Sequence, residues 1–453
     1  MIRAIGFLIV LAGLSALSVW FADNPGQVSL VWQGYVIETS AAVLVMGIVM
    51  IAIAAAVLYR LWVALKQAPG KIARNRRDAK TRRGYQALTR GIVAVAAGDA
   101  VEAKAQAGRA DGLLREPPLT MLLSAQAAQL DGDEAAAETF FTEMLDRPDM
   151  EFLGLRGLLG QAVKRNDQTA ALKLVRRASR LQPKSDWVTR TLFDQEARAG
   201  NWAKADAALN SALANKMLPE AEAVGHKAVL ALLQSVDAEK DGNPVEAMKL
   251  AKLAHGEDTS LVPAACQYSR LLTGMGKRSK ASGVIETTWA RQPHPDLAAA
   301  YWHTKDEEDA LARMKHAETL AAKNSGDDAS RLLLAGAAIE AGLWGVAREN
   351  LDDLPVTQAQ CRLMAALCEG EKDDKAAHEW LVRAAIAEPD ATWVCSDCGN
   401  LTDAWSALCG KCGNFNSFDW QRPSSIPGIA APQHETVPLL GADTVIDGDG
   451  PEQ

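Results

Sequence analysis

The stretch Arg198-Ala199-Gly200-Asn201-Trp202-Ala203-Lys204-Ala205 decides the fold of this 453-residue chain. A glycine followed by asparagine ends one helix and turns the chain, and an alanine five positions after the glycine lets the next helix approach its neighbour closely. The same arrangement, a turn-forming residue with alanine five positions later, recurs along the sequence. It occurs at Gly98 and Ala103, Gly132 and Ala137, Asn166 and Ala171, Gly242 and Ala247, Gly276 and Ala281, and Gly342 and Ala347.

These turns keep a regular spacing. The first four turn residues, from Gly98 to Gly200, follow one another at intervals of 34 residues, and so do Gly242 and Gly276. The interval from Gly200 to Gly242 is 42 residues, and the 66 residues from Gly276 to Gly342 leave room for one degenerate repeat around residues 306–323. A sustained period of this kind indicates stacked helical hairpins, although an unrelated bundle of alanine-rich hairpins remains an alternative.

The 34-residue period resembles that of tetratricopeptide repeats, over about residues 84–390. The resemblance implies a tetratricopeptide-like α-solenoid, whose inner surface holds a peptide or helix of a partner protein. We therefore expect a membrane-anchored, all-α chain that performs no chemistry of its own.

Two apolar segments precede the repeats. Residues 4–22 contain no charge over nineteen positions, and residues 39–59 contain none over twenty-one. Each would cover about 30 Å as a helix, which is the thickness of the hydrocarbon core of a bilayer. We expect transmembrane helices at residues 1–22 and 39–62, joined by a hairpin loop at residues 23–38. A cleaved signal peptide is the alternative for the first helix, but Trp20 is too large for its cleavage site.

Basic residues fix the expected orientation. The loop at residues 23–38 carries no lysine or arginine, whereas residues 60–90 carry ten basic residues and one acid, Asp78. This bias places the loop in the periplasm and both termini in the cytoplasm. Residues 63–90 are expected to form a basic juxtamembrane helix near anionic headgroups, with a fully solvated helix as the alternative. The formal net charge of -8 leaves an acidic body, which argues against nucleic acid as a partner.

Four of the seven cysteines form a pair of C-x2-C motifs separated by ten residues. They are Cys395, Cys398, Cys409 and Cys412. Four thiolates at this spacing complete a tetrahedral shell with no open position, which favours a structural zinc ion, with iron as the alternative metal. Disulfide pairing is the other alternative, and a reducing cytoplasm disfavours it. The segment resembles rubredoxin-type zinc ribbons, including the ribbon that ends LapB-type membrane proteins.

The ribbon is expected at residues 391–420 as a separate folding unit whose loss leaves the array intact. Residues 421–453 are rich in proline and glycine, carry five acids and one arginine, and are expected to form a disordered acidic tail.

Most of the chain resembles a known family. The segment Phe21-Ala22-Asp23-Asn24-Pro25-Gly26-Gln27-Val28 and the later Phe152-Leu153-Gly154-Leu155-Arg156-Gly157-Leu158-Leu159 are similar to those of HemY-type membrane proteins of Gram-negative bacteria. The resemblance covers about residues 1–390 and implies a two-span inner-membrane protein that acts near late steps of haem (tetrapyrrole) biosynthesis. The ribbon matches the LapB-type arrangement instead.

No combination of nucleophile, base and orienting residue stands out, so we expect no catalytic residues, no organic cofactor and no enzymatic activity. The expected function is that of a scaffold that binds partner proteins, possibly tetrapyrrole-pathway enzymes. A LapB-like adaptor in envelope lipid synthesis or membrane proteolysis is the alternative, and a redox carrier with a four-cysteine iron centre is a third. We do not expect direct haem ligation by any histidine, because none has a diagnostic setting. The histidines are His226, His255, His294, His303, His316, His378 and His434.

Overall fold

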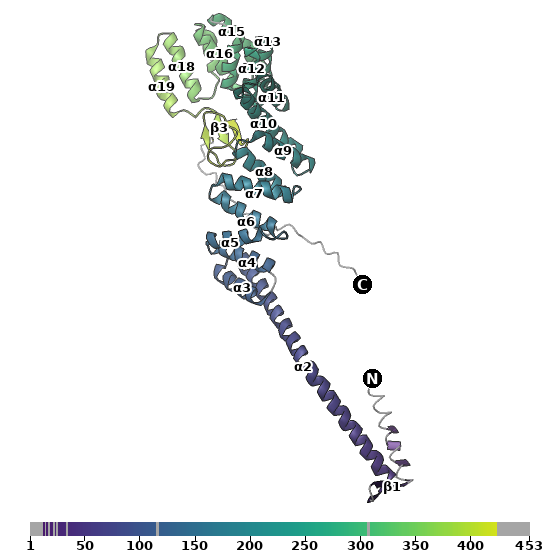
Figure 1. Ribbon diagram of the computed structural model, residues 1–453. Helices are drawn as coiled ribbons and strands as arrows, with labels where there is room; N and C mark the ends of the chain where they lie inside the picture. Colours follow the sequence, from purple (N-terminus) through teal and green to yellow (C-terminus); the bar gives the residue numbers. More distant parts are fainter. Residues whose placement is uncertain are drawn as a thin grey trace. The chain divides into compact units, whose positions relative to one another are not determined.

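The protein is described here from a computed structural model. The structure describes residues 26–32, 35–114, 117–305 and 309–423, with isolated residues between 12 and 23. It divides into two compact units, Met1–Asp133 and Glu134–Gln453. Helical hairpins of a tetratricopeptide-like solenoid make up most of the described chain, and a small β-ribbon follows the last hairpin (Figure 1). The expected fold class is confirmed, apart from the membrane span at residues 1–22.

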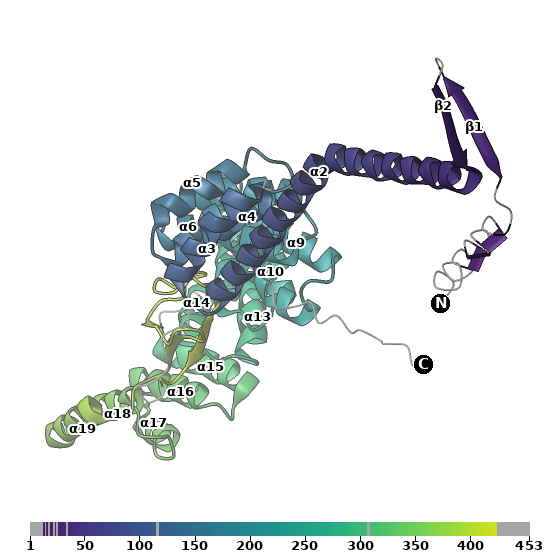
Figure 2. The same ribbon diagram turned by 90° about the horizontal axis from the view of Figure 1, so that it is seen from below.

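The first unit begins with a β-hairpin that leads into a long helix. Strands β1 (Gln27–Trp32) and β2 (Tyr35–Ser40) pair antiparallel with Trp32 opposite Tyr35, and α2 (Ala41–Ala96) follows directly (Figure 2). Within α2, Val43–Val63 has a mean hydropathy of 2.4 and none of the window is buried. This helix is the one candidate membrane span among the described residues. Most of the expected span at residues 1–22 lies outside them.

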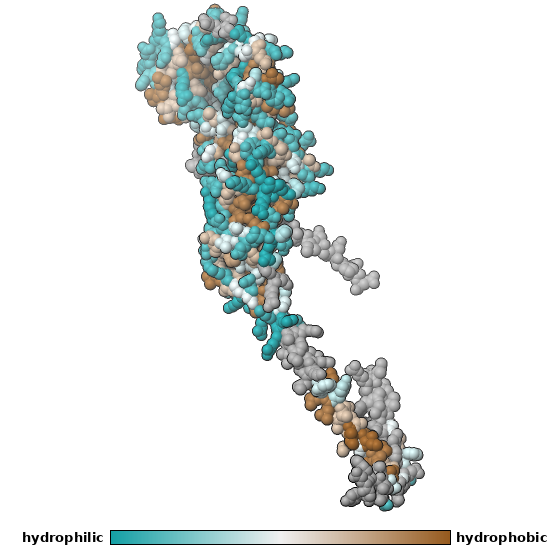
Figure 3. Space-filling view, viewed as in Figure 1, coloured by the Kyte–Doolittle hydropathy of each residue, from teal (hydrophilic) through white to brown (hydrophobic). Residues whose placement is uncertain are grey.

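The candidate span and the basic segment belong to one helix. α2 runs for 56 residues without a break, so residues 63–90 are a continuation of the span and do not form a helix of their own. Figure 3 shows the exposed apolar surface of the span. The described basic side chains that follow it on α2 are exposed: Arg76, Arg77, Lys80, Arg82, Arg83 and Arg90. The hydrophobic effect therefore favours a bilayer around the apolar part of α2 and water around the basic part that follows it.

The far end of α2 is the first helix of the array. It packs on α3 (Ala100–Leu113) and α4 (Pro117–Leu130) through a core that includes Leu88, Leu114 and Leu123. Glycines on α2 allow this approach, because a Cβ at Gly84 would lie 2.6 Å from Leu114 Cγ and one at Gly91 would lie 2.5 Å from Leu123 Cδ2. The candidate span is thus joined to the first helices of the array by continuous helix.

The second unit contains the remaining hairpins and the ribbon. Its helices are α5 (Glu134–Met144), α6 (Glu151–Lys164), α7 (Gln168–Leu181), α8 (Asp186–Arg198), α9 (Trp202–Ala214), α10 (Glu220–Lys240), α11 (Pro244–Glu257), α12 (Val262–Gly274), α13 (Arg278–Trp289), α14 (Pro295–Lys305), α15 (Ala310–Ala321), α16 (Asp328–Glu340), α17 (Trp344–Leu351), α18 (Gln358–Gly370) and α19 (Asp374–Ile386), with a short 3-10 helix at Ala322–Asn324.

Every turn anticipated from the sequence has the same backbone geometry. The seven turn residues have positive φ, from 56° at Asn166 to 77° at Gly132. In each turn, the next residue donates its N–H to a carbonyl five positions earlier, as Asn201 does to Glu196 and Asn243 does to Ala238. This pattern is the Schellman motif, which satisfies the last carbonyls of one helix while the chain reverses.

The alanines five positions after these turns are buried in the core. Ala103, Ala205 and Ala281 are 0% exposed, and the others are at most 1% exposed. An eighth turn, at Lys372 with φ of 65° and Ala377 3% exposed, escaped the sequence search because lysine seldom marks such a turn. The degenerate repeat expected around residues 306–323 comprises α14 and α15. Residues 306–308 between these helices are not among the described residues.

The longer interval between Gly200 and Gly242 comes from one helix. α10 has 21 residues, whereas α8 and α12 have 13 each. These eight additional residues match the excess of the 42-residue interval over the 34-residue period. They extend α10 at its N-terminal end, where Ala223 and His226 lie.

We expect packing at Gly157 to be a sensitive measure of the array's stability. A Cβ there would lie 2.3 Å from Cε1 of Phe141, which is fully buried, so Gly157→Ala should destabilise the chain by about 1–3 kcal/mol. Gly160→Ala on the same helix meets nothing within 4 Å and should stabilise it by roughly 0.5–1 kcal/mol. Thermal unfolding followed by circular dichroism distinguishes the two, and equal effects would contradict the packing described here.

Candidate metal centre and its docking on the array

Three short strands position the four cysteines. β3 (Thr392–Cys395) lies between β4 (Leu401–Thr402) and β5 (Phe418–Gln421) in an antiparallel sheet. Trp393 and Phe418 on these strands are buried with the cysteine side chains in one small core. Cys395 ends the central strand, so the sheet fixes the first cysteine and the two loops bring in the others.

The two C-x2-C motifs fold in the same way. Gly399 N–H donates to the Cys395 carbonyl at 2.9 Å, and Gly413 N–H donates to the Cys409 carbonyl at 2.8 Å. Both glycines have positive φ, 67° and 73°, which a residue with a side chain would adopt only with strain. The sequence therefore has one glycine in each turn, at the position that requires positive φ.

The four sulfur atoms lie at distances suited to a single metal ion. All lie within 4.8 Å of one another, with Cys395 Sγ 3.7 Å from Cys412 Sγ and Cys398 Sγ 3.6 Å from Cys409 Sγ. Tetrahedral zinc with bonds of about 2.3 Å would separate its sulfur ligands by about 3.8 Å. These distances are far longer than a disulfide bond, and all seven cysteines are free thiols. The group could bind a metal, and its geometry fits zinc or iron.

The protonation of the sulfurs responds to their surroundings. Burial raises the pKa of Cys412 to about 12. Burial acts in the same direction on Cys409, but backbone N–H groups of Cys412 and Lys411 donate to its sulfur and lower its pKa to about 7. Because a metal binds thiolates, loading this site must release protons, and acid must favour metal loss.

The ribbon inserts an aromatic side chain into the array. Phe415 lies in the turn after Cys412, and its ring centroid is 5.4 Å from that of Phe193 on α8 and 5.6 Å from that of His226 on α10. It belongs to the same buried cluster as Leu209 and Leu230, with Trp405 of the ribbon packed against it. Gly413 lies against Arg198, since a Cβ there would be 3.2 Å from the Arg198 Cζ. Figure 1 shows the ribbon beside α8 and α10.

A second contact joins the ribbon to the start of α14. The ring of His294 lies 4.0 Å from Trp420 and 5.3 Å from Trp393, measured between centroids. The side chain is 2% exposed, and its Nδ1 accepts a hydrogen bond from the Asp296 N–H. Burial lowers the pKa of His294 to about 4. The imidazole is therefore neutral at pH 7 in this contact.

Both ends of the ribbon are held by the array. Before the ribbon, Gln358 N–H donates to the Glu388 carbonyl and Ala359 N–H donates to Asp390 Oδ1, both at the start of α18. After it, Arg422 Nη2 lies 3.1 Å from Asp328 Oδ2 at the start of α16. The ribbon therefore has its own core and is also part of the core of the array, and the expectation that its loss leaves the helices of the array intact stays a prediction.

The structure brings together the four predicted cysteines and leaves the other three apart. Cys361 and Cys368 are buried in α18, and Cys266 lies on α12 with a pKa that burial raises to about 12. Sequence reasoning missed Phe415, His226 and His294 as contact residues. The lengthened repeat before Gly242 was the available signal, since it extends α10 at the place where the ribbon docks.

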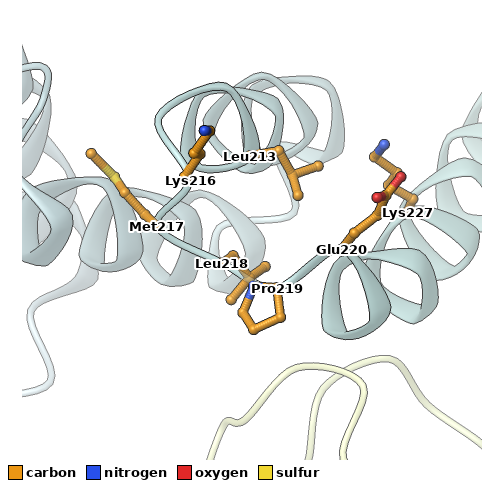
Figure 4. Close-up of a pocket in the computed structure, with 7 residues that line it drawn as sticks. All are labelled: Leu213, Lys216, Met217, Leu218, Pro219, Glu220 and Lys227. Carbon is orange, nitrogen blue, oxygen red and sulfur yellow. The ribbon is translucent and has the colours of Figure 1, made fainter.

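A surface cavity of about 740 Å³ lies where α9 is followed by α10. Its lining residues, drawn in Figure 4, are Leu213, Lys216, Met217, Leu218, Pro219, Glu220 and Lys227. Arg190 Nη2 holds this connection by donating to the Met217 carbonyl at 2.9 Å. The lining offers two ammonium groups and one carboxylate beside apolar side chains, and it contains no hydroxyl, thiol or imidazole.

Comparisons with known proteins agree with the N-terminal resemblance. Residues 26–132 match the family model described as HemY protein N-terminus. The match confirms the similarity to HemY-type proteins in that part of the chain. Over 437 residues, the chain is 26% identical to the probable magnetosome protein Mms48 of Magnetospirillum gryphiswaldense, an alignment that covers 93% of this chain and 94% of that protein.

Solved structures with similar helical arrays share little sequence with the chain. One is the Naa15/Naa10 complex bound to HypK-THB, with 16% identity, a TM-score of 0.43 and coverage of 71% of this chain and 52% of that one. Another is a tetratricopeptide repeat protein from Parabacteroides merdae, with 12% identity, a TM-score of 0.26 and coverage of 55% and 93%. The chain thus spans about half of the matched chain in the first structure.

We expect metal binding to depend on the clustered cysteines alone. Cys409→Ser removes one sulfur of the group and should reduce metal content from about one ion per chain to near zero. Cys266→Ser alters a thiol outside the group and serves as the matched control. Elemental analysis of the purified chain measures both, and metal retained by the Cys409 variant would contradict a four-sulfur site.

The contact at His294 should weaken in acid. Its pKa in the folded chain, about 4, lies below the ordinary value of 6.5, so stability is complete above pH 6.5 and falls as the pH drops towards 4, by up to about 1.4 kcal/mol per pH unit. His294→Leu should flatten the decline in melting temperature between pH 7 and pH 5, whereas His303→Leu, at an exposed position, should leave it unchanged. Identical profiles for all three proteins would show that the pKa of His294 is not lowered in the folded chain.

Proposed function

We propose that the chain is a non-enzymatic membrane adaptor that binds partner proteins on its helical array, in or near haem (tetrapyrrole) biosynthesis. The observation that carries the proposal is the continuity of α2, which includes both the apolar Val43–Val63 and the first helix of the array. A partner held by the array would therefore be held close to the bilayer. The HemY-like N-terminal region supports the choice of pathway.

The length of α2 sets the distance involved. Among the residues after the span whose burial the structure describes, Gly84 is the first buried one, 21 positions beyond Val63. At 1.5 Å per residue, the first hairpin would begin about 30 Å from the end of the span. The exposed arginines and Lys80 on this part of α2 suit a location beside anionic headgroups of the cytoplasmic leaflet.

The proposal includes an inner-membrane location with two spans, at residues 1–22 and 39–62, and cytoplasmic termini. The distribution of basic residues supports this orientation, because the loop at residues 23–38 has none. The proposal also includes Cys395, Cys398, Cys409 and Cys412 as ligands of a structural zinc ion. A closed shell of four sulfurs leaves no position for water or substrate, which supports a structural role for the metal.

A LapB-like adaptor role in envelope lipid synthesis or membrane proteolysis is the second candidate. The docking of a four-cysteine ribbon on the array favours it, because the ribbon lies outside the residues that match the HemY model. Both candidates require the array to hold partners at the membrane, and they differ in which partners are held.

Affinity purification of the tagged chain from solubilised membranes should recover enzymes of late tetrapyrrole synthesis. Ala79 is exposed in the middle of the helical connection, and Ala79→Pro should interrupt α2 at a local cost of about 3 kcal/mol. Recovery should fall several-fold in this variant, whereas Ala79→Gln should preserve both the helix and the recovery.

The other outcomes are equally informative. Recovery of envelope-lipid enzymes or a membrane protease would select the second candidate. Equal recovery by the two Ala79 variants would show that partner binding does not require a continuous α2. Turnover of a substrate by the purified chain would overturn the non-enzymatic proposal.

A further inference from the structure

The ribbon makes contacts that an ordinary repeat array lacks. In a simple solenoid each hairpin touches only its neighbours, so that local disturbances remain local. Here one small unit touches α8 and α10 through Phe415, His294 before α14 through Trp420, and Asp328 of α16 through Arg422. Its leading segment also hydrogen-bonds to the start of α18. These contacts join parts of the array that lie more than a hundred residues apart.

The docking residues depend on the four-cysteine group for their positions. Phe415 follows Cys412 by three residues, and Trp393 precedes Cys395 by two. The buried cluster of the ribbon consists of cysteine side chains together with Trp393 and Phe418, packed against Trp405 and Trp420. A segment of about thirty residues with so few apolar side chains is too small to fold by hydrophobic burial alone and needs the free energy of metal binding.

The interface is well packed but incompletely hydrogen-bonded. Arg198 Nε, His294 Nε2 and Trp393 Nε1 are buried and have no hydrogen-bond partner among protein atoms. A buried polar group without a hydrogen bond costs free energy, so each of the three offsets part of the gain from apolar burial. These unpaired groups lower the stability of the docked state.

We propose that the ribbon is a metal-dependent brace that fixes the relative positions of the helices from α8 to α18. With metal bound, the ribbon is folded and holds these hairpins in one arrangement of the inner surface. Without metal, the ribbon unfolds, the docking contacts separate, and each hairpin is restrained only by its neighbours. This inference concerns regulation of the array and rests on the proposed function only in treating the array as a surface for partners.

Amide hydrogen exchange of the full-length chain in detergent tests the brace directly. Cys395→Ser combined with Cys398→Ser should remove the metal and accelerate exchange in α8, α10 and α14 by about tenfold, while α6 and α7 keep their rates. Chelation of the unmodified chain should have the same effect, and adding zinc back should reverse it. Reversal by metal separates a brace from general damage caused by substitution.

A second variant separates docking from metal binding. Phe415→Ala keeps the four cysteines and should keep about one metal ion per chain, yet exchange in α8 and α10 should rise about tenfold. Leu401→Ala, at a ribbon side chain that is 52% exposed, is the matched control and should leave the array unchanged.

Two results would overturn the brace. The first is unchanged exchange in α8, α10 and α14 when the metal is lost. The second is acceleration confined to residues 391–422. Neither result bears on the adaptor function, which is tested by partner recovery. That function does not require the ribbon to restrain the array. Conversely, a chain that recovers no partners can still show the full exchange pattern.

Discussion

The close approach of helices at buried alanines is the constraint on which the array depends. Ala103, Ala205 and Ala281 have no exposed surface, and each follows a left-handed turn residue by five positions. The turn fixes where the second helix begins, and the alanine fixes how near it can come to its neighbour. A larger side chain at these positions would separate the helices and disturb packing along the stack, because protein interiors have little free volume.

The ribbon modifies this simple architecture. A linear stack transmits strain poorly, since each hairpin is bound only to the next. The additional residues of α10 bring His226 against Phe415, and Gly225 lies so near the ribbon that a Cβ would be 3.1 Å from Asn416 Nδ2. The lengthened helix and the small ribbon are thus two parts of one interface, although they lie far apart in the sequence.

Sequence reasoning recovered those features that are encoded locally. A glycine or asparagine with positive φ and an alanine in a fixed phase are visible without coordinates, as is the spacing of the four cysteines. Lys372 was missed because its left-handed conformation is imposed by the surrounding helices and not favoured by its own side chain. The pairing of Phe415 with Phe193 was missed because contacts across more than two hundred residues leave no periodic signal in a single sequence.

The continuity of α2 has a geometric consequence for the first hairpin. In an α-helix each residue advances the chain by about 1.5 Å and turns it by about 100°. The number of residues between Val63 and Gly84 therefore determines the direction in which α3 and α4 lie from the axis of α2, as well as their distance from the candidate span. An insertion of one residue would rotate α3 and α4 about the axis of α2 by about 100°. We therefore expect natural insertions and deletions in this stretch to have lengths that restore the original direction.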